Sequence, residues 1–319
     1  SIKSYELSLS IDPNYAEAHN NLGNVFRELG QFEDALNCYK KAIKLDQNYV
    51  EAFFSASISL QSLGRYEDMV EYLERVLVLK SNFSEGYNNL GIAFKEIGLY
   101  SKAISAYQKA LEIKPDYFEA LNNLGNAYKN NNELEKAIES YQKALSISPD
   151  YPTLHNNLGN ALKEFGEVER AIQCFRQAIE INPEFPDSHN NLGDAFRELN
   201  QFDDAVESYE KAINLDPNYF EAFNNLGTAF KDLDKLDEAV SSYEKALKIN
   251  PAFSDSYNNL GNVLKKLGKL DEALDCYEKG IALNPDDVDI HNNIGRLFSK
   301  LKRMDEALKL YKTAVKINP

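Results

Sequence analysis

Apolar and aromatic residues recur every three or four positions in the segment AHNNLGNVFRELG, which begins at Ala18. At about 100° per residue they share one face of a helix, and they are His19, Leu22, Phe26 and Leu29. Two adjacent asparagines, Asn20 and Asn21, stand beside this stripe, although asparagine is about 0.7 kcal/mol less favourable than alanine in a helix. The pattern predicts an amphipathic helix whose asparagines have a role other than helix formation.

The NNLG motif of this helix returns along the chain with a fixed period. Successive copies lie 34 residues apart, or 68 across one gap, and the last copy reads NNIG. With Ala16 as position 1, every repeat that carries the motif has Gly at position 8, Ala at position 20 and Tyr or Phe at position 24. The small residues indicate two helices in close approach. Neither helix can bury its apolar face alone, so each repeat must pack against its neighbours.

Two further positions predict where the helices end. Position 15 is Gly, Asn or Asp in eight repeats, and position 32 is Pro from Pro115 onward. Gly and Asn tolerate the left-handed backbone that ends a helix, and Pro cannot continue one. Lys302 departs from this pattern in the last repeat, so we expect its turn to be strained or differently shaped.

These residues together resemble the tetratricopeptide repeat, a 34-residue helix–turn–helix unit. The resemblance covers essentially the whole chain. It implies an all-α fold, a right-handed superhelix or α-solenoid, with two antiparallel helices per repeat, A and B, and a concave groove lined by the A helices. Residues 1–15 match only helix B of a truncated repeat, so we expect a segment of a longer protein. Nine repeats follow as one continuous solenoid: 16–49, 50–83, 84–117, 118–151, 152–185, 186–219, 220–253, 254–287 and 288–319.

The composition narrows the class of partner. The 319 residues carry a formal net charge of −15 with positive residues interspersed, which disfavours nucleic acid and tolerates a basic or neutral peptide. No apolar run reaches the roughly 18 residues of a membrane-spanning helix. The start of the sequence also lacks the apolar core of a signal peptide. We therefore expect no membrane insertion and a cytoplasmic location.

No set of residues predicts catalysis, a metal site or a cofactor. The three cysteines, Cys38, Cys174 and Cys276, share one repeat position and lie 136 and 102 residues apart, which predicts small apolar packing residues in a reducing compartment. Acidic residues recur at position 2, where the dipole of helix A favours them. There is no phosphate-binding glycine loop and no GxSxG turn. Position 4 holds histidines that we expect to be packed and hydrogen-bonded: His19, His155, His189 and His291.

The face opposite the apolar stripe predicts the binding site. It contains positions 2, 5, 6, 9, 12 and 13, so the predicted groove is rich in amides with a basic row beside them. The predicted peptide-binding residues are Asn21, Asn24, Asn89, Asn123, Asn126, Asn157, Asn160, Asn191, Asn225, Asn259, Asn262, Asn293, Lys95, Lys129, Lys163, Arg197 and Lys231. An extended peptide repeats donors and acceptors, so a ladder of amides can hold it without reading its side chains. The alternative is that the amides bond to the adjacent repeat, and one asparagine of each pair can serve each purpose.

The second repeat is the exception. Phe54 and Ser55 replace the two asparagines, and Ser57 replaces the glycine. Phe54, Ile58 and Ile92 should be neighbours in the groove, where we predict an apolar pocket for an anchoring side chain. The alternative is a compensating change of packing that involves no ligand.

The asparagines at position 6 resemble the ladder in the arrays of O-linked N-acetylglucosamine transferases, which implies binding of peptide backbone. Two functions follow: a non-catalytic protein-interaction scaffold, or the substrate-recruiting arm of a larger glycosyltransferase whose catalytic domain lies outside this sequence. The carboxylate clamp of co-chaperones fits less well, because it needs Lys at position 5 and basic residues at position 2. RNA binding by a related helical repeat would predict 35-residue spacing and a basic groove. The 34-residue period and the net charge of −15 argue against it. Uncapped solenoid ends would allow self-association.

Overall fold

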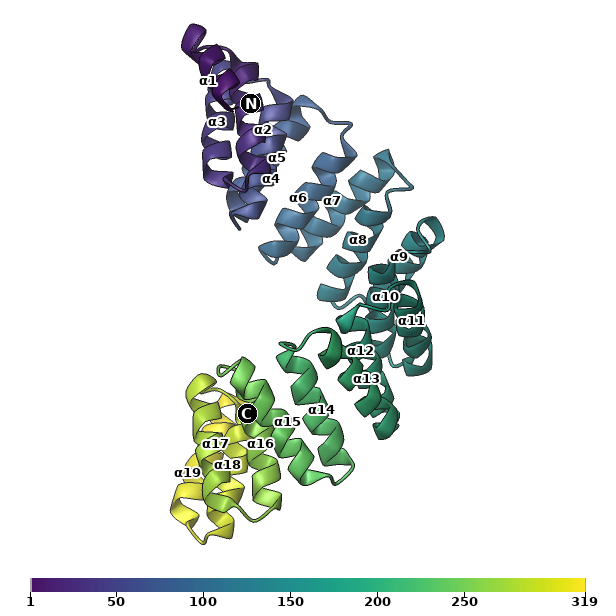
Figure 1. Cartoon of the computed structure of the whole chain (residues 1–319), viewed down its shortest axis with the longest axis vertical. Helices are drawn as coiled ribbons and strands as arrows, with labels where there is room; N and C mark the ends of the chain where they lie inside the picture. The colour runs from purple at the N-terminus through teal and green to yellow at the C-terminus, as the bar shows by residue number, and fades with distance from the viewer. Residues whose placement is uncertain (1, 319) are drawn as a thin grey trace. The chain divides into compact units, whose positions relative to one another are not determined.

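The computed structural model describes residues 2–318, and this range contains nineteen helices and no strand (Figure 1). The all-α fold that the sequence predicts is confirmed. The even-numbered helices carry positions 1 to 13 of the repeat, and we call them A helices. They are α2 (Ala16–Glu28), α4 (Val50–Ser62), α6 (Ser84–Glu96), α8 (Phe118–Asn130), α10 (Pro152–Glu164), α12 (Pro186–Glu198), α14 (Phe220–Asp232), α16 (Ser254–Lys266) and α18 (Val288–Lys300).

The odd-numbered helices carry the second half of the repeat, and we call them B helices. They are α1 (Ile2–Ile11), α3 (Phe32–Leu45), α5 (Tyr66–Leu79), α7 (Tyr100–Ile113), α9 (Leu134–Ile147), α11 (Val168–Ile181), α13 (Phe202–Leu215), α15 (Leu236–Ile249), α17 (Leu270–Leu283) and α19 (Met304–Ile317). Where position 32 is Pro, the B helix ends two residues before it, as α7 does before Pro115.

The residue at position 15, just after each A helix, has a left-handed backbone conformation. The φ angle there is positive in all nine repeats, from 60° at Asn132 to 91° at Gly166. Lys302 adopts φ 61°, so its turn has the shape of the others rather than a different one. Because Lys carries a Cβ and lacks the local hydrogen bonding of Asn or Asp, this backbone is strained at Lys302.

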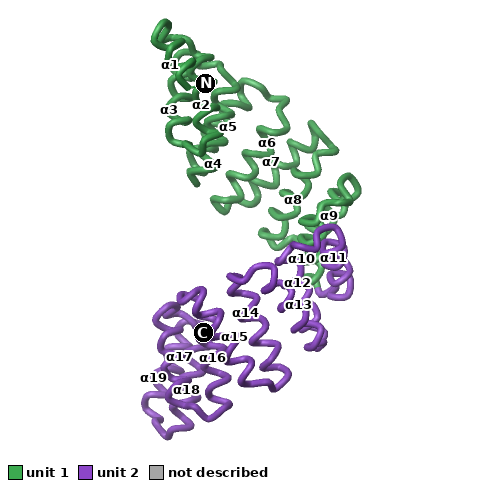
Figure 2. The backbone as a smooth tube through the Cα atoms, in the orientation of Figure 1, with its two compact units in different colours: residues 1–165 green, residues 166–319 purple. Residues whose placement is uncertain are grey.

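Two compact units divide the chain, residues 1–165 with α1–α10 and residues 166–319 with α11–α19 (Figure 2). Within each unit every helix packs against the next helix in sequence. Successive A helices also contact each other, as α6 and α8 do in the first unit and α14 and α16 in the second. Within each unit no two successive B helices among the described residues pack comparably, and neither do α4 and α6. The A helices therefore form a shared surface in each unit, which we call the A-helix face.

The core of most repeats depends on a glycine packed beneath a tyrosine ring. A Cβ added to Gly125 would lie 2.5 Å from Cε1 of Tyr141, a distance that real Cβ atoms do not reach. Gly91 and Tyr107 have the same relationship at 2.5 Å. Position 8 is therefore glycine because the ring at position 24 occupies the space of a side chain.

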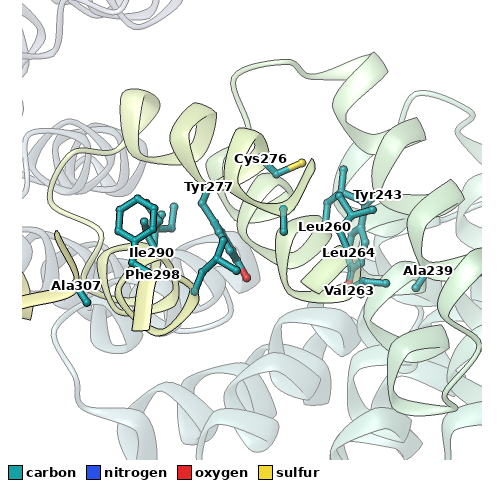
Figure 3. Packing of buried hydrophobic residues seen from close by; sticks show 13 residues of the cluster. Ala239, Tyr243, Leu260, Val263, Leu264, Cys276, Tyr277, Ile290, Phe298 and Ala307 are labelled. Atoms are coloured by element: carbon teal, nitrogen blue, oxygen red, sulfur yellow. The ribbon is translucent and has the colours of Figure 1, made fainter. Parts of the chain in front are cut away.

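Buried side chains continue from helix to helix in the second unit. One cluster joins residues of α15 to α19, among them Tyr243, Leu260, Tyr277, Ile290 and Ala307 (Figure 3). Cys276 belongs to this cluster as a free thiol, and burial raises the pKa of Cys276 to about 11. The cysteine is therefore a protonated packing residue near neutral pH.

Candidate functional site

Every residue predicted to bind a peptide lies on an A helix, from Asn21 on α2 to Asn293 on α18. The three residues of the predicted apolar pocket lie on α4 and α6. The predicted residues thus all lie on A helices of the two units. The hydrogen bonds within the fold determine which donors and acceptors of each side chain remain unused.

Asparagines from neighbouring A helices are hydrogen-bonded to each other. Asn123 Nδ2 donates to Asn88 Oδ1 at 3.0 Å, so position 6 of one repeat bonds to position 5 of the preceding repeat. Four more bonds have this register: Asn157 to Asn122 at 2.9 Å, Asn225 to Asn190 at 3.1 Å, Asn259 to Asn224 at 3.0 Å and Asn293 to Asn258 at 2.8 Å. We call these five bonds the asparagine ladder.

The ladder explains why a poor helix former is repeated. A neutral hydrogen bond contributes about 1 kcal/mol net. That is close to the helix-propensity cost of the two asparagines that form it. Asn88 is only 5% exposed, and a buried amide oxygen without a donor would cost a further 1–3 kcal/mol or so. The position-5 asparagine is thus the acceptor, buried at Asn88, Asn190 and Asn224 and half-buried at Asn122 and Asn258, and the position-6 asparagine is its donor.

Position 6 retains hydrogen-bonding groups that the ladder does not use. Asn123, Asn157 and Asn259 are half-buried, and each donates one N–H to the ladder. Among residues 2–318 no donor lies within hydrogen-bonding distance of their side-chain oxygens. Each amide carries two N–H hydrogens and two acceptor sites. One N–H and the oxygen with both its acceptor sites therefore remain at each of these positions, so one side chain can bond to the next repeat and to a ligand.

The ladder is interrupted on both sides of the second repeat. Ser55 provides no amide donor, and Asn20 Oδ1 is buried without a hydrogen-bond partner in the described structure. Phe54 provides no acceptor for Asn89, whose Oδ1 accepts instead from Asn88 Nδ2 at 3.3 Å. The loss of the motif in one repeat thus leaves an unsatisfied polar atom in its neighbour.

Position 9 is joined to the tyrosine at position 24, a pairing that the sequence reasoning missed. The Tyr39 hydroxyl donates to Asn24 Oδ1 at 2.8 Å and the Tyr141 hydroxyl to Asn126 Oδ1 at 2.7 Å. Asp194 and Asn262 accept from Tyr209 at 2.7 Å and Tyr277 at 2.9 Å in the same way, and Thr228 lies 3.1 Å from the Tyr243 hydroxyl. Asn24, Asn126 and Asn262 therefore have their side-chain oxygens engaged within the fold.

The third repeat breaks this pairing. Ile92 occupies position 9 and offers no acceptor, so the fully buried Tyr107 hydroxyl has no partner among the described residues. Burial raises the pKa of Tyr107 well above its ordinary value. The sequence carried a signal for this pairing, because position 9 is polar in six of the seven repeats that have Tyr at position 24, and Ile92 is the exception.

Acidic side chains accompany the basic row at position 12. Lys95 Nζ lies 2.7 Å from Glu96 Oε1, and Lys129 Nζ lies 3.7 Å from Glu164 Oε2 of the next repeat. In the second unit Arg197 and Lys231 share Asp232, at 3.8 Å and 4.0 Å. Their partners occupy position 13. Most of the predicted row is thus charge-compensated by the fold itself, and Lys163 is half-buried on α10.

The predicted apolar pocket has one contact that the sequence did not indicate. The ring of Phe54 packs edge-on against Phe83, with 4.9 Å between their centroids, and Lys80 Nζ lies 4.4 Å from the Phe83 centroid. Ile58 and Ile92 are half-buried. Phe54 is therefore held from one side by the fold, and the pocket shared with Ile58 and Ile92 stays a prediction.

The four histidines each bond to a backbone carbonyl six residues earlier. Nε2 of His155 lies 2.7 Å from the Pro149 oxygen and Nε2 of His189 lies 3.1 Å from the Pro183 oxygen. His19 and His291 bond to Pro13 and Pro285 at 3.0 Å and 2.9 Å. Since a carbonyl only accepts, Nε2 carries the proton in each ring. The histidines thus satisfy a carbonyl beyond the end of the preceding B helix.

Neither a metal-binding cluster nor a membrane-spanning helix occurs among residues 2–318. No group of three or more His, Cys, Asp or Glu side chains is arranged to hold a metal ion there. None of the helices in this range combines the length and apolar character needed to cross a membrane.

Family models match most of the chain. Models described as TPR repeat match residues 96–132, 125–166, 159–196, 193–234 and 228–268. A model described as Tetratricopeptide repeat matches residues 16–49, 254–287 and 288–319. A search of curated protein sequences found no match.

Solved structures are similar over part of the chain. A crystal structure of MamA is 32% identical with a TM-score of 0.49, and the match covers 51% of this chain and 95% of MamA. A second MamA structure is 31% identical with a TM-score of 0.49, covering 53% of this chain and 92% of the other. The crystal structure titled "YrrB: a TPR protein with an unusual peptide-binding site" is 20% identical with a TM-score of 0.50, covering 59% of this chain and 97% of YrrB. The YrrB match is a likeness of fold.

Proposed function

Since this chain belongs to the tetratricopeptide repeat family, we propose that it is a protein-interaction scaffold that binds an extended peptide along its A-helix face. The scaffold is non-catalytic in itself, and its partner is a protein or peptide segment. We propose further that the nine repeats of residues 16–319, with residues 1–15 as a truncated repeat, form the binding array. The partners of an array of this kind are held by many small contacts spread over successive repeats.

The observation that carries this proposal is the state of the position-6 amides. The ladder holds each amide in one orientation, so its unused donor and acceptor are fixed before a ligand arrives. A peptide group needs one donor and one acceptor, which is what Asn123, Asn157 and Asn259 have left. Preorganised groups bind with a smaller loss of side-chain entropy. The position-5 partner, whose oxygen accepts the ladder bond, therefore supports binding by holding the position-6 amide in place.

The other predicted residues have secondary parts in this proposal. Asn24, Asn126 and Asn262 still carry N–H donors beside the oxygen that accepts from tyrosine. Asn21, Asn89, Asn160, Asn191 and Asn225 are half-buried on the same faces, whereas Asn293 is 8% exposed and has little left to present. Phe54, Ile58 and Ile92 would receive an apolar anchor. Their combined replacement by alanine should weaken binding of peptides with such an anchor.

The substrate-recruiting arm of a larger glycosyltransferase is the second candidate. This candidate is favoured by the asparagines at position 6 of eight repeats, because a row of asparagines at this position is the feature that resembles the transferase arrays. In this candidate the A-helix face works in the same way, and the chemistry belongs to a domain outside this sequence.

Selection from a displayed library of random 12-residue peptides tests the proposal. The selected peptides are resynthesised, and their affinities are measured by fluorescence anisotropy against two blocking variants. Glu119→Trp places a bulky ring one turn before Asn123 on α8, and Gln142→Trp places the same ring on the exposed side of α9. We expect Glu119→Trp to weaken binding and Gln142→Trp to leave it unchanged. Equal affinities, or no selected peptide, would contradict the proposal.

A further inference from the structure

The last two A helices change the charge pattern of the A-helix face. At position 13, α6, α10, α12 and α14 carry Glu96, Glu164, Glu198 and Asp232, whereas α16 and α18 carry Lys266 and Lys300. Position 9 changes as well, because Arg296 of α18 stands where α8, α12 and α16 have Asn126, Asp194 and Asn262. The acids that compensate the basic row elsewhere are therefore replaced by cations at this end.

Lys265 of α16 and two of these cations, Arg296 and Lys300, lie on neighbouring helices. Lys265 is half-buried on α16, and its Nζ donates to Asn262 Oδ1 at 3.2 Å, the same oxygen that accepts from the Tyr277 hydroxyl. Arg296 and Lys300 are exposed and stand four residues apart on the neighbouring α18, so they share one face of that helix. We call Lys265, Arg296 and Lys300 the basic cluster.

The cluster has no acidic partner in the described structure. None of its three side chains forms an ion pair within residues 2–318, whereas the adjacent Lys266 is paired with Asp234 at 2.5 Å. Burial lowers the pKa of Lys265, and the charges of Arg296 and Lys300 lower it further. The free protein thus holds three like charges together without compensation, although the whole chain has a net charge of −15.

Helix dipoles account for only part of this arrangement. Lys265 and Lys300 stand in the last turns of α16 and α18, where a cation is favourable. Arg296 lies one turn further from the end of α18, beyond the reach of this effect. Arg296 stands three residues after the ladder donor Asn293, so the two residues share one face of α18.

We propose that the basic cluster binds acidic side chains of the peptide held on the A-helix face, so that the ligand carries two or more Asp or Glu residues where it crosses α16 and α18. This proposal rests on the proposed function and adds the chemical class of the ligand. Two N–H groups of the Lys265 ammonium remain for a carboxylate after its bond to Asn262. The Arg296 guanidinium can hold a second carboxylate with two parallel hydrogen bonds.

A designed peptide tests the cluster directly. The probe is a fluorescein-labelled, C-terminally amidated 12-residue Gly/Ser peptide with four consecutive Glu residues, and its control has four Gln residues instead. We expect the Glu peptide to bind the full chain about tenfold more tightly in 50 mM salt or less, and this difference to shrink as salt screens the charges. Equal affinity for the two peptides, or no binding of the Glu peptide, would overturn the proposal.

Charge-reversal variants test whether the Glu peptide binds at the basic cluster. Lys265→Glu/Arg296→Glu should remove the preference for Glu over Gln, whereas Lys245→Glu/Lys248→Glu, the same charge change on exposed residues of α15, should keep it. A loss in both variants would mean that only the overall charge matters, against the cluster. A Gln peptide with a free C-terminal carboxylate that binds as tightly as the Glu peptide would identify a terminal carboxylate as the ligand and overturn the claim for side chains.

One further variant separates binding from folding. Arg296→Asn restores the residue found at position 9 of other repeats and offers an acceptor to Tyr311, the tyrosine at position 24 of the same repeat. We expect it to raise the unfolding temperature while weakening the Glu peptide several-fold. Library-selected peptides that bind wild type and Lys265→Glu/Arg296→Glu equally would contradict the cluster and leave the proposed function intact. Failure of every peptide to bind wild type would contradict both.

Discussion

Asn123 and Asn88 belong to successive repeats, and the side chain of the first donates a 3.0 Å hydrogen bond to the buried side chain of the second. The bond links two A helices through residues that are individually unfavourable in helices. It also fixes the orientation of the half-buried Asn123 amide. Stability between repeats and presentation of a binding group thus depend on the same contact.

Completing the ladder at the second repeat should stabilise the first unit. In the Ser55→Asn variant the new amide can donate to Asn20 Oδ1, which is buried without a partner. We expect a gain of about 1 kcal/mol in the free energy of unfolding, measured by urea denaturation and by slower hydrogen exchange in α2 and α4. Ser55→Ala, which offers no donor, is the control. A Ser55→Asn variant no more stable than Ser55→Ala would show that the ladder cannot be extended there.

The two tyrosines at position 24 of adjacent repeats should respond differently to loss of their hydroxyls. Tyr141→Phe removes the donor to Asn126 and should cost about 1 kcal/mol. Tyr107→Phe removes a buried hydroxyl that has no partner, so it should cost nothing or increase stability. Ile92→Asn should stabilise the protein by supplying the missing acceptor. Urea denaturation of the three variants checks this, and equal losses in the two Phe variants would refute the assignment.

The turn at Lys302 should be improved by glycine. Lys302 has φ 61°, in a region that costs an ordinary L-residue about 1–2 kcal/mol. We expect Lys302→Gly to stabilise α18 and α19 by about 1 kcal/mol, after subtraction of the extra freedom of glycine in the unfolded chain. The reverse change at the equivalent turn, Gly268→Lys, should destabilise by a similar amount. Hydrogen exchange of the helices beside each turn measures both, and no change in either would contradict the strain.

Acidification should weaken the packing around His189. Burial, with a smaller effect of Lys211, lowers the pKa of His189 below its ordinary value of 6.5. The unfolded chain therefore takes up this proton at higher pH than the folded chain, and stability falls as pH drops below about 6.5. Phenylalanine already occupies position 4 in another repeat, at Phe223. The His189→Phe variant should therefore lose less stability than the wild-type protein between pH 7.5 and pH 5.5. Parallel pH dependence of the two proteins would rule out His189 as the cause.

The sequence was sufficient for the helices and for their faces, because a period of 34 residues and a stripe of apolar positions determine both. It did not reveal which side chains meet. The bond from Asn123 to Asn88 spans 35 residues and depends on how far α6 and α8 are shifted along each other, which periodicity does not specify. The contact between Phe54 and Phe83 is similar, since it joins a helix face to the start of the next A helix.

The candidate site was predicted in composition but not in detail. The helical periodicity predicted that the amides and cations share one face. It also led us to predict that the side chains at position 9 bind a ligand. The tyrosine hydroxyls at position 24 instead occupy the oxygens of Asn24, Asn126 and Asn262, because those rings reach past the glycine at position 8. The absence of a side chain at position 8 thus allows the tyrosine ring to reach position 9 and determines the hydrogen bonding there.

The affinity of a library-selected peptide for two double variants tests the central claim most directly. Asn123→Ala/Asn157→Ala and Asn88→Ala/Asn122→Ala break the same two ladder bonds, but only the first removes the amides that face a ligand. We predict that the first pair lowers affinity about tenfold or more, and that the second pair, at comparable loss of stability, stays within about threefold of wild type. Equal affinities of the two double variants would contradict the claim that the position-6 asparagines bind the peptide.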